Sequence, residues 1–266
     1  MATLVARPTT IYEITQLGEA VRRQLLSSLV PEQMLSLLDP PLDGPLADAP
    51  RLHVGCAEKW GLVRLQLRAR ADDPDPMLLA ELGDMAFAQV ELVMTVINDP
   101  RSERFDIDRL PDGRLTYLGT TERNLKEEER AMRAGLAPCQ VKRGLRMFKH
   151  FLPRLEQFLQ AMGKQAVMVD ALTYHSAILY ERYGFGYMPG SRALMERIHQ
   201  EFQPGGPLFA KLDKSTPFRA PGADRTIRGR AWAIHDGVLN GRWEQPRMFK
   251  RIGQRASITT FPGPSY

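Results

Sequence analysis

The clearest hydrophobic pattern in the chain lies in residues 145–162, where apolar side chains recur at intervals of three or four. The stripe predicts an amphipathic helix that ends at Gly163 and is kinked or broken at Pro153. Residues 165–170 are almost all apolar, which is typical of a buried central strand, and residues 173–183 form a second helical stretch that closes at Gly184. Helix, buried strand and helix in this order predict an α/β arrangement.

Before this region the pattern is more mixed. Residues 11–30 have helical periodicity, Pro31 opens a shorter helix to Leu38, and prolines then mark a linker up to residue 50. Residues 52–56 and 63–68 predict two strands of a hairpin, and the strongly apolar residues 77–97 predict a buried helix.

Two further elements are expected before residue 140. Residues 105–110 and 114–118 flank a turn at 111–113, which predicts a hairpin. Asn124 is then expected to cap a helix over 125–134 that stops at Gly135. In the C-terminal part of the chain, Pro and Gly break the pattern into short pieces, and residues 230–235 with those after Val238 predict one more hairpin.

These elements divide the chain into three predicted parts. Residues 1–50 are a helical prefix and linker, 51–187 a core, and 188–266 a basic extension packed on that core. The extension is basic because residues 186–266 hold 13 Lys and Arg against 6 Asp and Glu, whereas the whole chain carries a formal charge of only +5. Such a surface suits an anionic partner or keeps the protein soluble.

Composition narrows the class of protein. Hydrophobic residues make up 43% of the chain and charged residues 25%, as in a globular protein with a real core. No apolar run reaches the ~20 residues of a membrane span, and the first residues lack a secretory signal, so we expect a cytoplasmic protein without membrane contact. Cys56 and Cys139 have no CxxC partner and are expected to be reduced, one of them in a strand.

A basic loop directly precedes the long predicted helix. Residues 140–144 read Gln-Val-Lys-Arg-Gly, and Arg146, Lys149 and His150 follow on the side of the helix away from its apolar stripe. A helix start presents backbone N–H groups and the positive end of the dipole, which together favour a phosphate. The loop therefore predicts either a phosphate site or a solvated basic face.

The residues after the loop resemble a known family. Leu179-Tyr-Glu-Arg-Tyr-Gly-Phe185, reached through a helix, a strand and a second helix, resembles the closing phrase of the GNAT superfamily of acyl-CoA N-acyltransferases. The resemblance covers residues 140–187 and implies a GNAT-like α/β (α+β) fold, a mixed sheet flanked by helices. It also implies acyl-CoA, for example acetyl-CoA, as cosubstrate, no metal, and a small-molecule or peptide amine as acceptor.

The resemblance assigns roles to particular residues. The coenzyme A site would comprise Gln140, Val141, Lys142, Arg143, Gly144, Leu145, Arg146 and Thr173. Lys142 stands where the family has its first loop glycine, Cys139 takes the glutamine position, and Thr173 replaces a frequent asparagine. Tyr180 matches the tyrosine that protonates the leaving thiolate, although a tyrosine packed between helix and sheet is an equal alternative. The general base stays open among Glu122, Glu127, Glu128 and Asp170.

Three functions follow from these observations. The first is acyl transfer from acyl-CoA to an amine, and the second a GNAT-like binding or regulatory protein without catalysis. The third is nucleic-acid binding by the basic extension with Trp232, Trp243 and Phe249, although aromatic side chains buried in a hairpin explain the same pattern. The five histidines never reach metal-ligand spacing, so no metal is expected. The oligomeric state stays open.

Overall fold

The computed structural model describes residues 7–86, 89–119 and 121–263, which form two compact units. Unit 1 contains Gly144–Val169, Lys250–Gln254 and the described residues up to Ser102. Unit 2 contains Glu103–Arg143, Asp170–Phe249 and the described residues from Arg255 onward. Neither unit is therefore one continuous stretch of sequence.

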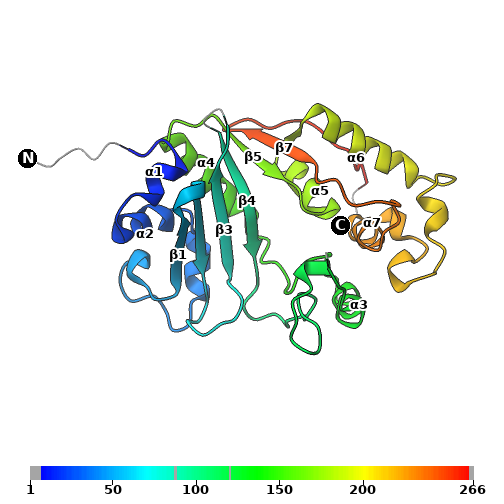
Figure 1. Ribbon diagram of the computed structural model, residues 1–266, viewed down its shortest axis with the longest axis horizontal. Helices are drawn as coiled ribbons and strands as arrows, with labels where there is room; N and C mark the ends of the chain where they lie inside the picture. The colour runs from blue at the N-terminus through cyan, green and yellow to red at the C-terminus, as the bar shows by residue number, and fades with distance from the viewer. Residues whose placement is uncertain (1–6, 87–88, 120, 264–266) are drawn as a thin grey trace, which may run out of the picture. The chain divides into compact units, whose positions relative to one another are not determined.

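A sheet forms the framework of unit 1 (Figure 1). Its first four strands make an antiparallel meander: β1 (Leu52–Ala57), β2 (Leu62–Leu67), β3 (Leu78–Asp84) and β4 (Val90–Ile97). The fifth strand, β5 (Ala166–Asp170), pairs with β4 in parallel. The end of β7 (Arg247–Arg251) follows β5, and in unit 2 the start of β7 pairs with β6 (Gly186–Tyr187). The result is a seven-stranded mixed sheet in the order β1-β2-β3-β4-β5-β7-β6.

One face of the meander is more deeply buried than the other. On that face Leu52, Leu65, Leu78 and Leu92 are buried, whereas His53, Gly55 and Arg64 on the other face are exposed. Alternation of this kind is expected of an antiparallel sheet that is covered on one side. The unit's helices are α1 (Ile11–Thr15), α2 (Glu19–Ser27) and α4 (Phe148–Ala161), and α4 lies behind the strands in Figure 1.

Unit 2 has its own core. Its helices are α3 (Leu125–Arg133), α5 (Tyr174–Arg182), α6 (Pro189–Glu201) and α7 (Ile227–His235). Trp232 of α7 is 1% exposed, stacks on Phe218 with ring centroids 5.2 Å apart, and donates a hydrogen bond to the carbonyl of Leu136 at 2.8 Å. This cluster joins the residues before α4 to the C-terminal part of the chain.

Several predicted elements are confirmed. The hairpin of β1 and β2, the helix capped by Asn124, the strand at 166–170 and the helix after Thr173 all form close to their expected bounds. Cys56 lies in β1, and both cysteines are free. Pro153 lies inside α4, and the helix continues through this residue without a break.

Other predictions are wrong. Residues 77–97 form the antiparallel strands β3 and β4 instead of a helix, because the β-branched residues of 90–97 favour a strand. The helix expected over 11–30 is divided into α1 and α2, and the long helix begins at Phe148 rather than Leu145. The expected hairpin at 105–118 keeps its turn but has a single bridge, Arg109 to Leu115. Residues 230–235 belong to helix α7, which Thr226 caps, so they are not a strand.

The fold is thus of mixed α/β class. Among the described residues, no helix is long and apolar enough to cross a bilayer. The three-part division at residues 50 and 187 stays a prediction.

Cutting the chain after Gly190 should prevent folding of unit 2. The fragment would lose α7 with the buried Trp232, the strand β7 that pairs with β6, and Thr260, whose backbone N–H and hydroxyl donate to the buried Glu181. We expect an insoluble or molten product in near-ultraviolet circular dichroism and thermal melts. The full-length Thr260→Ala protein is the control and should still melt cooperatively. A soluble fragment with a cooperative melt would contradict the expectation.

Candidate functional site

The end of β4 and the start of the α4 region lie side by side in unit 1. Gly144 forms an antiparallel bridge with Asn98, and the backbone N–H of Leu145 donates to the carbonyl of Ile97 at 3.3 Å. A Cβ on Gly144 would approach the same carbonyl oxygen to 3.3 Å, which is closer than most side chains tolerate. Glycine therefore suits this crossing of two backbones.

The chain then turns sharply into α4. Arg146 has a left-handed backbone with φ +56°, a conformation that costs a non-glycine residue roughly 1–2 kcal/mol. Met147 is the N-cap of α4 and contributes no side-chain hydrogen bond to the helix start. The first turn of α4 therefore depends on other groups to satisfy its N–H donors. Backbone strain next to an uncapped helix start is an arrangement found at ligand sites.

The strands beside this loop separate. The parallel ladder of β4 and β5 consists of Val90 with Val167 and Glu91 with Met168. Within the described residues, β4 has no partner in β5 after Glu91, although it continues to Ile97. The carboxyl ends of parallel strands are where open α/β sheets usually bind ligands, and the loop 144–147 lies at this end of β4.

The side chains of this loop differ in exposure from the expectation. Arg146 and Lys149 are exposed, and neither has an ion-pair or hydrogen-bond partner among the described residues. Lys142, by contrast, is only 8% exposed. A depression of about 440 Å³ beside α4 is lined by Lys149 and His150 together with Arg154, which pairs with Glu32 at 2.6 Å.

The first four residues assigned to the coenzyme A site belong to unit 2. The side-chain oxygen of Gln140 accepts from the N–H of Ala137 at 2.8 Å, and the carbonyl of Val141 accepts from Phe105 at 2.8 Å. Arg143 donates to the carbonyl of Ala134 at 3.0 Å. These residues therefore brace the segment around α3. In unit 1 the structure brings together only Gly144, Leu145 and Arg146.

Thr173 is the N-cap of α5. Its hydroxyl accepts from the N–H of Ser176 in a capping box and lies 2.9 Å from Nδ1 of His175. Burial, and then the charge of Arg228, lower the pKa of His175 to about 4, so this imidazole is neutral at pH 7. The position assigned to cofactor binding thus has a local role in starting the helix.

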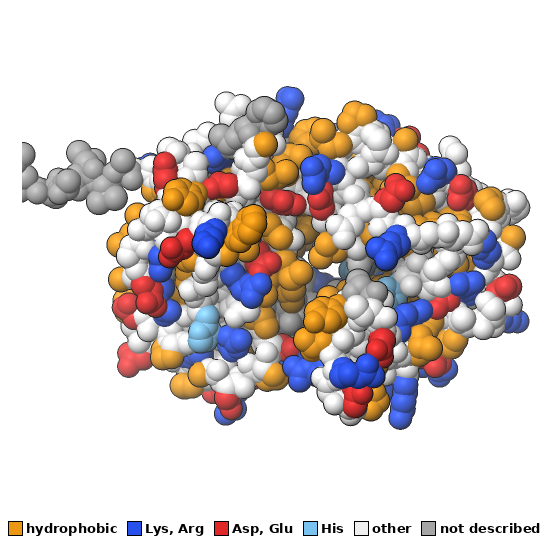
Figure 2. Space-filling view, in the orientation of Figure 1, with side chains coloured by type: hydrophobic (Ala, Val, Ile, Leu, Met, Phe, Trp, Pro, Cys, Tyr) orange, Lys and Arg blue, Asp and Glu red, His pale blue; other side chains and the backbone are white. Residues whose placement is uncertain are grey.

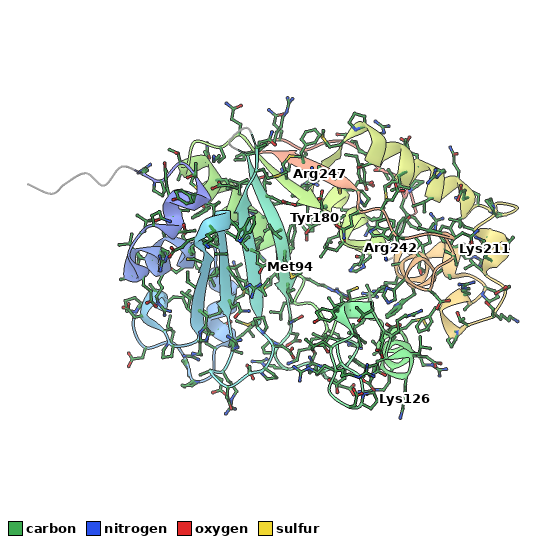
Figure 3. The ribbon with its side chains drawn as sticks, in the orientation of Figure 1. Met94, Lys126, Tyr180, Lys211, Arg242 and Arg247 are labelled. Atoms are coloured by element: carbon green, nitrogen blue, oxygen red, sulfur yellow. The ribbon has the colours of Figure 1, made fainter. Side chains whose placement is uncertain are left out.

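Tyr180 lies on α5 with its ring against Phe185, at 5.1 Å between centroids, and is partly exposed (Figure 3). The next residue, Glu181, is buried and accepts hydrogen bonds from Tyr187 at 2.9 Å and from the backbone N–H of Thr260 at 2.8 Å. Burial raises the pKa of Glu181. Within the closing phrase, Glu181 therefore anchors the C-terminal segment.

The four carboxylates considered as general base are all in ion pairs in unit 2. Glu122 pairs with Arg114 at 2.7 Å, Glu127 with Arg130 at 2.6 Å, and Asp170 with Arg247 through both of its oxygens. Glu128 is buried and bonds to Arg123 and His235. None of them offers an unengaged carboxylate.

Glu128 and Asp236 share one buried network. Arg123 bridges the two carboxylates, and Arg219 and Thr216 also donate to Asp236, each at 2.8 Å. Burial would raise the pKa of Glu128, but hydrogen bonds from His235 and Arg123 outweigh it and hold the pKa below its ordinary value. Burial likewise opposes the bonds from Arg123, Thr216 and Arg219 that lower the pKa of Asp236.

Sequence reasoning missed one further carboxylate, Glu81 of β3, which is 6% exposed and lies in the segment that had been predicted as a helix. Apolar and polar residues do not alternate across residues 78–84, so the sequence carries no signal for the position of Glu81 in a strand.

No group of three His, Cys, Asp or Glu side chains that could hold a metal occurs in the described part of the chain. Comparison with family models, with curated proteins and with solved structures finds no match to this chain.

The network of Glu128 and Asp236 predicts loss of stability in acid. A carboxylate whose pKa is lowered on folding stabilises the fold fully above its unfolded pKa, about 3.9–4.3, and loses that contribution as the pH falls further. We expect the melting temperature to drop below about pH 4. Glu128→Gln should lower the melting temperature at pH 7 and flatten this drop. Parallel pH curves for the two proteins would contradict the assignment.

Proposed function

We propose that this protein is a cytoplasmic enzyme of GNAT type that transfers an acyl group from acyl-CoA to an amine. The observation that carries the proposal is the loop 144–147, which enters α4 beside the end of β4, where β4 and β5 separate. The mixed sheet, with its parallel pair of β4 and β5, and the helix–strand–helix order of α4, β5 and α5 also support it.

The loop suits the diphosphate of coenzyme A on three counts. Gly144 keeps the chain close to β4, Arg146 turns it into an uncapped helix start, and Arg146 and Lys149 add two exposed positive charges. Backbone N–H groups and the helix dipole favour a phosphate at such a position. Lys142 is buried, and Arg143 donates to the carbonyl of Ala134. In this proposal the positive charge at the phosphate site therefore comes from Arg146 and Lys149.

The unpaired length of β4 suits the rest of the cosubstrate. Beyond Glu91 the backbone of β4 has no partner in β5 among the described residues, and the pantetheine arm carries two amide groups. An extended chain with amides can add to such an edge as a strand would, through main-chain hydrogen bonds. In this proposal Tyr180 donates the proton to the leaving thiolate, as the resemblance implies.

A binding protein without catalysis is distinguished from this enzyme by thioester consumption. Nucleic-acid binding by the basic extension is less well supported, because one of its three aromatic residues, Trp232, is buried against Phe218 and cannot stack on a base.

Arg146 tests the cofactor site through two matched variants. Arg146→Gly removes the charge and relieves the left-handed backbone, whereas Arg146→Ala removes the charge and keeps the strain. Both should weaken coenzyme A binding by about tenfold or more in calorimetry, since a hydrogen bond to a charged group contributes about 1.5–3 kcal/mol. Only Arg146→Gly should also raise the melting temperature.

Lys149→Glu should weaken binding further than either variant, because it places a negative charge at the helix start. Lys126→Glu on α3 is the control and should bind like the unchanged protein. Equal affinity for all four variants would remove the loop from the site.

Tyr180 should matter to turnover more than to stability. Tyr180→Phe keeps the ring and its packing on Phe185, so the melting temperature should stay within a few degrees. Loss of a positioned proton donor typically costs 10²–10⁴-fold in rate. Steady-state assays with a thiol-detecting dye measure this directly, and full activity of the variant would return Tyr180 to a packing role.

A further inference from the structure

Two depressions adjoin along α4 in unit 1. The first has a volume of about 440 Å³ and the second about 330 Å³, and Arg154 and Gln157 line both of them. Across from α4, the first is lined by the 3₁₀ helix η1 (Glu32–Leu37) and the second by Leu25 of α2. Because they share residues, the two form one groove, the α4 groove. Each volume is that of a small-molecule site.

The first depression is the basic end of the α4 groove. Lys149, His150 and Arg154 line it, and Glu32 is the one acidic lining residue in the described part of the chain. Arg154 pairs with Glu32 at 2.6 Å, and the Glu32 side chain is 79% exposed. The side chains of Lys149 and His150 have no hydrogen-bond or ion-pair partner among the described residues. This end therefore has an excess of positive charge that suits an anion.

The second depression is the apolar end. Leu25 of α2 lines it together with Phe158 and Met162 of the α4 region, and none of its described lining residues is acidic. Phe158 and Met162 are 6% and 5% exposed, so the packing of the core holds them in place. Ala161 also lines this depression, and its methyl side chain leaves room beside them. An apolar group bound here would be removed from water without covering a carboxylate.

The sheet of unit 1 has no such separation of charged from apolar side chains. Over strands β1–β4, Figure 2 shows acidic and basic side chains scattered among hydrophobic ones. Interspersed charges are typical of a surface that keeps a protein soluble. The α4 groove is basic at one end and apolar at the other, which indicates a ligand with a charged end and an apolar end.

The length of the groove narrows the class of ligand. His150 and Met162 are twelve residues apart, which corresponds to about 18 Å along a helix that rises about 1.5 Å per residue. The hydrocarbon core of a bilayer is about 30 Å thick, so the chains of one leaflet span about 15 Å. One acyl chain with its head group therefore matches the distance from the basic end to the apolar end.

We propose that the α4 groove binds a single-chain lipid with an anionic head group, such as a long-chain fatty acid. The head lies at the basic end against His150 and Arg154, and the chain lies along Leu25, Phe158 and Met162. The site belongs to unit 1 alone and does not rest on the proposed acyl transfer. A fatty acid and a lysophospholipid share this chemistry, and the test below separates them.

Gln157 and Gln160 supply a matched pair of variants. Both are exposed on α4, but of the two only Gln157 lines the groove. Gln157→Glu places a negative charge in the groove without changing the shape of the side chain, whereas Gln160→Glu makes the same change outside it. Both variants should melt like the unchanged protein, because neither residue belongs to the core. Lys149 also lies near the loop assigned to coenzyme A, so it is left unchanged.

Glu32→Gln acts in the opposite direction. It removes the acid that offsets the charge of Arg154 and keeps the shape of the side chain. An anion should therefore bind this variant about two- to fivefold more tightly, as expected for the loss of an exposed ion pair. A purely structural role of the pair would give no gain in affinity.

The experiment measures dodecanoate binding by calorimetry below its critical micelle concentration. We expect binding by the unchanged protein, about fivefold or greater weakening in Gln157→Glu, and a change of less than about twofold in Gln160→Glu. From octanoate to dodecanoate the affinity should rise about two- to fourfold for each methylene. Dodecyltrimethylammonium, with the same chain and a positive head, should bind much more weakly. Preference for dodecanoate over dodecyl phosphate supports a fatty acid, and the reverse preference supports a lysophospholipid.

Absence of dodecanoate binding would overturn the site. So would equal affinities for the anionic and cationic probes, equal affinities of Gln157→Glu and Gln160→Glu, or an affinity independent of chain length. Sedimentation equilibrium tests a second copy of the chain as the occupant. If the unchanged protein is a dimer that Ala161→Glu converts to a monomer, the groove is an interface between copies and the lipid proposal is wrong. Coenzyme A binding, tested at Arg146, is independent of these outcomes.

Discussion

The backbone contacts of residues 97–98 with residues 144–145 fix the start of α4 beside the end of β4, and the candidate site in unit 1 depends on them. They return the chain to the sheet at the point where it left, so that α4 starts beside the end of β4 even though residues 99–143 intervene. Because the entropy cost of closing a loop grows only slowly with its length, a long excursion can be accommodated once its ends are joined in this way. α4 then leads directly to β5, the parallel neighbour of β4.

The success of the sequence predictions depended on how local the signal was. α4 has a periodic apolar stripe, and Asn124 and Thr173 cap α3 and α5 through their own side chains. Residues 77–97 have no such local signal, because strands that are largely buried lose the alternation that distinguishes them from a helix. α7 lacks such a stripe too, because most of its side chains are buried, and Gly229 in its first turn disfavours a helix. Glycine is needed there because α7 packs closely on the preceding turn, where a Cβ would lie 2.4 Å from the carbonyl oxygen of Ala223.

In the candidate site, too, features set by neighbouring residues could be predicted, whereas features set by contacts between distant residues could not. The position of the loop before α4 followed from the sequence, because a glycine and a run of basic residues precede a strong stripe. The orientation of its charges did not follow, because helical steps of 100° apply only from Phe148 onward and the left-handed Arg146 reverses the chain just before it. In the structure Lys142 is buried and Arg146 is exposed. Glu81 could not be found at all, since its position depends on two strands pairing across a bulge.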